Sequence, residues 1–169
     1  MALAAWSGFA TIIGSAAAAL TGLLFVAVSI RIDYIARSQE LRNRSAQTLS
    51  LFGTVLVIGV LMAIPGQGYR TFGAELLVLA VITGAGLYVL DRRATARRSD
   101  QAIGRILEAV TPNAVTSVLL IATGIVLVLG VHAGLYLLVV PVLTAMVGGV
   151  ASAWLLLIKL TEEPTDQAH

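Results

Sequence analysis

One long uncharged stretch constrains this chain more than any other feature. It runs from Ser7 to Ile30 and is followed directly by the first basic residue, Arg31. About 20 apolar residues in a helix are enough to cross the hydrocarbon core of a bilayer. The stretch therefore predicts a transmembrane helix.

The composition extends this prediction to the rest of the chain. Of the 169 residues, 58% are hydrophobic and 12% are charged, whereas soluble domains carry about 25% charged residues. The mean hydropathy is +0.93, and the charges lie between long apolar runs. We therefore predict an all-α, polytopic membrane protein that forms one domain over residues 1–169. Arginine far outnumbers lysine, which favours a bacterial source and hence a multi-pass protein of the bacterial inner membrane.

Five apolar runs are expected to form spans, at about 7–30, 49–64, 72–90, 113–131 and 135–160. Pro65 and Gly66 end the second run, because proline lacks an N–H and disfavours helix in the residue before it. The last two runs, read as one helix, would exceed roughly 65 Å, about twice the thickness of the hydrocarbon core. We therefore expect a tight hairpin, which Gly130 and Gly134 permit.

Two polar segments lie outside these spans. Residues 99–110 combine apolar and charged side chains at helical spacing, which predicts a short amphipathic helix. It would lie at the membrane surface or against the end of the bundle. Residues 161–169 form a polar tail.

The basic residues predict the orientation. Five spans place ten of the eleven on one side of the membrane and only Arg70 on the other. Basic loops face the cytoplasm, so the N-terminus is expected outside and the C-terminus inside. The ten are Arg31, Arg37, Arg42, Arg44, Arg92, Arg93, Arg97, Arg98, Arg105 and Lys159. Each could also attract an anionic lipid headgroup, for about 1 kcal/mol, and membrane lipids are expected partners.

Aromatic residues agree with this orientation, because they concentrate at membrane interfaces. Nine of the ten lie at or near the expected ends of spans, and only Phe25 lies clearly within one. The outer set is Trp6, Phe9, Tyr69, Phe72 and Tyr136, and the inner set is Tyr34, Phe52, Tyr88 and Trp154.

The spans lack the residues that catalysis and ion coupling require. No ionisable side chain falls near the expected middle of the membrane, where such groups mark proton relays and coupling sites. There is no cysteine, and no nucleotide-binding, hydrolase or metalloprotease motif. We expect neither an enzyme nor a metal or other cofactor. The arginines are explained by topology, so nucleic acid is not an expected partner.

The first span carries a stripe of small and weakly polar residues that has two interpretations. Such residues pack against another helix, or they form a water-facing pore wall when copies of the helix surround an axis. We call these residues the stripe: Gly8, Thr11, Ser15, Ala18, Gly22 and Ser29.

Similar residues recur in the last two spans and indicate helix packing. They are Thr116 and Thr123 in the fourth span, and Thr144, Gly148, Gly149 and Ser152 in the fifth. Pro141 interrupts the fifth span and predicts a kink, which could act as a hinge.

Glu75 is the only acidic residue expected on the outer side. It could interact with its helix N-terminus or pair with Arg70. Repeated around a symmetric assembly, it could instead form a ring that attracts cations at a pore entrance. Nearby His132 is expected to be a turn residue rather than a pH sensor.

These features lead to two main hypotheses about function, and the arginines alone suggest a lipid-handling role as a third. The first is a homo-oligomeric passive ion channel that weakly prefers cations. The second is a non-conducting accessory or assembly subunit that packs on a larger membrane protein.

Overall fold

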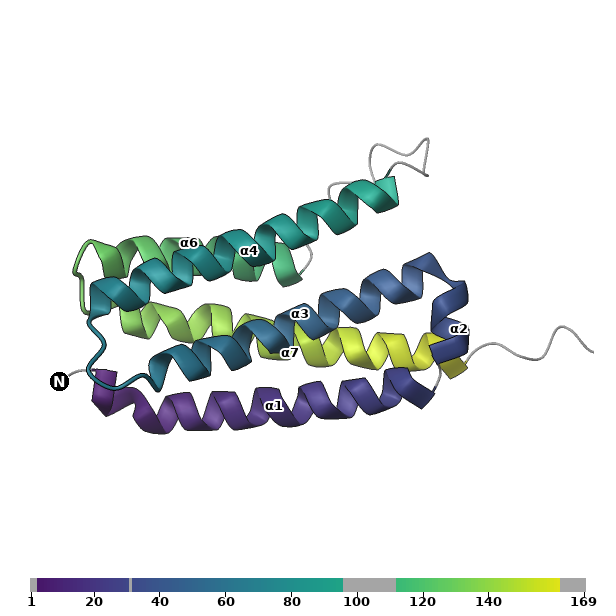
Figure 1. Ribbon diagram of the computed structural model, residues 1–169, viewed down its shortest axis with the longest axis horizontal. Helices are drawn as coiled ribbons and strands as arrows, with labels where there is room; N and C mark the ends of the chain where they lie inside the picture. Colours follow the sequence, from purple (N-terminus) through teal and green to yellow (C-terminus); the bar gives the residue numbers. More distant parts are fainter. Residues whose placement is uncertain (1–2, 31, 96–111, 162–169) are drawn as a thin grey trace, which may run out of the picture.

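The computed structural model describes residues 3–30, 32–95 and 112–161, and over these residues the protein is helical (Figure 1). The amphipathic stretch predicted at 99–110 and the tail beyond residue 161 lie outside these ranges. In chain order the elements are η1 (Leu3–Trp6), α1 (Ser7–Ile30), α2 (Ile32–Arg37), α3 (Gln39–Met62), α4 (Tyr69–Thr95), α6 (Pro112–Val128) and α7 (Gly134–Thr161).

Three helices of the described chain are long and apolar enough to cross a membrane, which indicates a membrane protein. They provide the candidate spans Ser7–Ile30, Leu41–Met62 and Gly134–Ile158. Helix α6 is apolar but shorter, with 17 residues. Helix α4 has 27 residues and carries Arg70 and Glu75 near its start.

The five long helices alternate in direction and form three layers (Figure 1). Helices α4 and α6 form one outer layer, α3 and α7 the middle layer, and α1 the other outer layer. One end holds η1, the start of α4 and the α6–α7 connection, and we call it the Trp6 end. The opposite end holds α2, and we call it the α2 end.

Helix α3 occupies the centre and α1 the edge of the bundle. Half of the apolar span of α3 is buried (50%), against 39% for α7 and only 17% for α1. The main core joins α1, α3, α4, α6 and α7, and includes Val55, Phe72 and Leu138. A second cluster at the α2 end contains Leu24, Phe52 and Leu156.

Helix α3 begins ten residues before the span predicted at 49–64. Ser38 caps it, because its hydroxyl accepts a hydrogen bond from the Leu41 backbone N–H at 3.4 Å. Leu41, Ser45 and Thr48 are all buried, at helical spacing along one face. The helix therefore continues through the arginine-rich segment, whose charges occupy its other faces.

The hairpin expected between the last two spans is present. Gly130 has φ +84°, its N–H donates to the Leu127 carbonyl, and the Val131 N–H donates to the Val126 carbonyl. These bonds form a Schellman motif, in which a residue in the left-handed conformation ends the helix. Gly134 then starts α7 against Leu127, with no room for a larger side chain.

Several aromatic residues gather at the Trp6 end, and two others are buried in the core. Trp6 packs edge-on against Phe9 and Tyr136, with ring centroids 5.5 and 5.1 Å away. Phe52 and Phe72 are 1% and 0% exposed. Both therefore fill the space between helices, and their expected position at the membrane interfaces stays a prediction.

Candidate functional site

The stripe lies on the face of α1 that is turned away from the bundle. All six of its residues are exposed. The opposite face of α1 is buried and consists of Ala10, Ile13, Ala17 and Leu24. Among the described residues, the stripe therefore meets no neighbouring helix, and packing through it against another long helix requires a second molecule.

The stripe glycines have open space around them. A Cβ at Gly8 or Gly22 would meet no neighbouring atom within 4 Å. The close approach of α1 to α3 instead uses Gly14 and Gly59: a Cβ on Gly59 would lie 3.0 Å from Gly14 Cα and 3.1 Å from the Ala10 carbonyl oxygen. Sequence reasoning missed this pair, although both are glycines in apolar runs.

Two hydroxyls of the stripe are bonded to their own helix. Thr11 Oγ1 donates to the Ser7 carbonyl at 2.9 Å, and Ser29 Oγ donates to the Phe25 carbonyl at 2.8 Å. The hydroxyl hydrogens are thereby used, while the oxygen lone pairs remain. At these two positions the face can accept hydrogen bonds or contact a cation.

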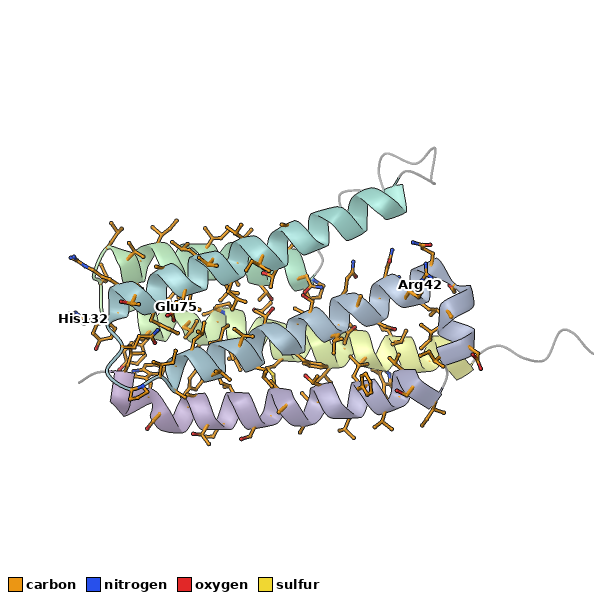
Figure 2. The ribbon with its side chains drawn as sticks, viewed as in Figure 1. Arg42, Glu75 and His132 are labelled. Atoms are coloured by element: carbon orange, nitrogen blue, oxygen red, sulfur yellow. The ribbon has the colours of Figure 1, made fainter. Side chains whose placement is uncertain are left out.

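Glu75 lies at the Trp6 end, as does His132 (Figure 2). Glu75 is half-buried, and its Oε2 accepts a hydrogen bond from Gln67 Nε2. The structure records no ion pair between Glu75 and Arg70. The Arg70 guanidinium lies instead beside Gly130, about 3.6 Å from where a Cβ would stand, near the C-terminus of α6. A cation is favourable there because it complements the helix dipole.

The structure does not bring Glu75 and the stripe together. Helix α4, which carries Glu75, lies on the far side of α3 and α7 from α1 (Figure 1). A pore surrounded by copies of α1 would therefore have Glu75 in another layer, and not among its lining residues.

Two buried polar atoms at the Trp6 end, Gln67 Oε1 and the Tyr69 hydroxyl, have no hydrogen-bond partner among the residues that the structure describes. Buried groups of this kind usually bond to water. The Tyr69 ring also contacts His132 edge-on, with centroids 4.7 Å apart. In the sequence, this region was interpreted only as the link before an apolar span, so these buried polar groups were not predicted.

Several small residues of the last two helices pack inside the chain, whereas Thr144 and Ser152 are half-buried. Thr116 and Thr123 are 3% and 0% exposed. A Cβ on Gly148 would lie 2.6 Å from Pro112 Cβ. Pro141 is buried within α7, which continues as a single helix through it.

No metal site is found in residues 3–30, 32–95 and 112–161, where no three histidine, aspartate or glutamate side chains lie close enough to share an ion. Comparison with protein-family models, curated proteins and solved structures finds no match for this chain.

Proposed function

We propose that this protein is a five-span bacterial inner-membrane protein, with its N-terminus outside, that self-associates through α1 into a passive ion pore. One observation supports the proposal most: all six stripe residues lie on the outward face of a helix that is only 17% buried. Small residues let helix backbones approach closely and are enriched at helix interfaces in membranes. An exposed stripe on a peripheral helix fits contact between copies.

A weak preference for cations follows from the stripe hydroxyls. The hydrogens of Thr11 and Ser29 are donated to the backbone of α1, so the oxygens would face a central axis as acceptors. Rings of oxygen dipoles favour cations, and weak contacts let ions leave as readily as they enter. This basis for cation preference does not require Glu75.

The test compares two variants at neighbouring positions. Gly22→Leu fills the open stripe, whereas Leu23→Ala shortens a side chain that is 68% exposed and lies outside the stripe. We expect Gly22→Leu to abolish the oligomer or reduce cation flux into liposomes at least tenfold, and Leu23→Ala to change neither. Unchanged particle mass and flux in Gly22→Leu would contradict the proposal.

The accessory-subunit function is the second candidate. It is favoured by the hydroxyls of Thr11 and Ser29, whose hydrogens are already donated to the backbone of α1. These two positions of the stripe can therefore pack against another protein without water. Such a subunit would be monomeric or dimeric when purified alone, would leave liposomes impermeable, and would co-purify from cells with one larger membrane protein.

A further inference from the structure

We propose that a groove between α1 and α7 at the α2 end binds one acyl chain of an anionic phospholipid. The groove has a volume of about 210 Å³. Its floor is formed by Leu24, Phe52 and Leu156, which are 7%, 1% and 2% exposed. Leu23 and Trp154 stand at its rim and are largely exposed.

The groove exists because α1 and α7 both pack on α3 and make little contact with each other. Gly149 of α7 lies over the Phe52 ring, so closely that a Cβ would be 2.5 Å from Cε1. The absence of a side chain at Gly149 thus leaves room for the Phe52 ring, which lines the groove.

The lining admits hydrocarbon and offers nothing to a polar ligand. Every lining residue is apolar apart from the indole N–H of Trp154. An apolar cavity of about 150 Å³ stays dry and takes up benzene, and this groove is larger.

The shape of the groove fits a chain better than a helix. It extends along α1 from Leu20 to Val28, which is about 12 Å at 1.5 Å per residue. A second helix would be about 10 Å wide, whereas an acyl chain is a single file of methylene groups and can lie along a groove of this length. A helix from a second copy could cover the groove but could not enter it.

The surroundings identify the source of the chain as a lipid with an anionic headgroup. All the lining residues lie within the three candidate spans, where the surrounding medium is acyl chains. The groove ends at the α2 end, the end of the bundle at which Arg42 lies on α3 (Figure 2), and both Arg42 and the neighbouring Arg44 are exposed. Trp154 is 64% exposed and can donate its N–H to an ester or phosphate oxygen, as tryptophans at membrane interfaces do.

Quenching of Trp154 fluorescence tests the proposal, because bromine on an acyl chain quenches a tryptophan that it touches. The chain has two tryptophans, so Trp6→Phe leaves Trp154 alone. This variant is reconstituted in vesicles of equal parts phosphatidylglycerol and phosphatidylcholine, with bromine on one lipid or the other. We expect about fivefold enrichment of phosphatidylglycerol beside Trp154, the factor that one nearby arginine supplies.

A matched pair of variants shows whether the groove is responsible. Ala27 lines the groove, whereas Ala19 is exposed elsewhere on α1. In the Trp6→Phe background, Ala27→Leu should remove the enrichment and Ala19→Leu should preserve it. Circular dichroism of each variant verifies the helical fold.

Three results would overturn the proposal. Equal quenching by the two brominated lipids would mean that no anionic lipid is retained. Absence of quenching by either lipid would mean that protein covers the groove. Enrichment that survives Ala27→Leu would place the lipid elsewhere on the surface.

Discussion

At the scale of single residues, the glycines of this chain fall into two groups. Gly59, Gly73 and Gly124 lie where two backbones cross, and a Cβ on any of them would come within 3.1 Å of another helix. Gly8, Gly22 and Gly53 have nothing within 4 Å. Glycines of the first group determine how the helices of one chain pack, whereas those of the second leave open space that another molecule can fill.

This division predicts opposite effects of alanine at two positions of α3. In Gly59→Ala the new Cβ would press on backbone atoms of Gly14 and Ala10 at 3.0–3.2 Å, which cannot move aside as a side chain can. We expect a loss of about 1–3 kcal/mol in the free energy of unfolding, measured by denaturation with SDS in mixed micelles. Gly53→Ala is the control and should be neutral or stabilising by up to about 1 kcal/mol. Equal effects would show that the α1–α3 crossing is not close.

A second prediction concerns Gly149 and the ring of Phe52. Gly149→Ala alone should cost about 1–3 kcal/mol of stability, because its Cβ would overlap the ring. Replacing the ring by Phe52→Leu removes the obstacle, so in that background Gly149→Ala should cost at least about 0.5 kcal/mol less. Strictly additive losses in the same micelle denaturation would mean that the two side chains are not in contact.

At the scale of elements, features that depend on the local sequence were predicted correctly, whereas features that depend on packing between helices were not. The bounds of α1 match the predicted span because an uncharged stretch ending at a basic residue defines a span locally. The start of α3 was missed because its first turns contain arginines and look like a polar loop in the sequence. Leu41, Ser45 and Thr48 in these turns are buried by other helices, which the sequence alone does not show.

The face of α1 could not be predicted for a different reason. In a soluble helix, polarity marks the outer side, but lipid is as apolar as a protein core. Ile12 and Leu23 are 69% and 68% exposed, while Ile13 and Leu24 are 6% and 7% exposed. Residues of the same type thus lie on both sides, and the sequence contains no signal that separates them.

The α6–α7 hairpin gives a prediction about an element. Gly130 has φ +84°, a conformation that costs a residue with a Cβ about 1–2 kcal/mol. Gly130→Ala should therefore destabilise the protein by about that amount and speed amide hydrogen exchange in the hairpin. Gly130→Asn should cost less, because asparagine tolerates this conformation. Gly86→Ala, in open space on α4, is the control, and equal losses from Ala and Asn at residue 130 would contradict the assignment.

At the scale of the whole molecule, the alternating helices separate two chemically distinct ends. The α2 end carries Arg42 and Arg44 on α3, while the Trp6 end combines an aromatic cluster with Glu75, Arg70 and His132 (Figures 1 and 2). An end rich in arginine faces the cytoplasm in most membrane proteins. The proposed orientation, the pore and the lipid groove all depend on this asymmetry, so it merits a direct test.

Cysteine labelling provides that test, since the chain contains no cysteine and each introduced thiol is unique. Gly68 is exposed at the Trp6 end, and Gln39 is exposed at the α2 end. In intact cells, we expect a membrane-impermeant maleimide to label Gly68→Cys, and to label Gln39→Cys only after the membrane is permeabilised. The reverse pattern would mean that the N-terminus faces the cytoplasm. Labelling of both residues in intact cells would contradict a bundle that crosses the membrane, and with it the pore and the lipid groove.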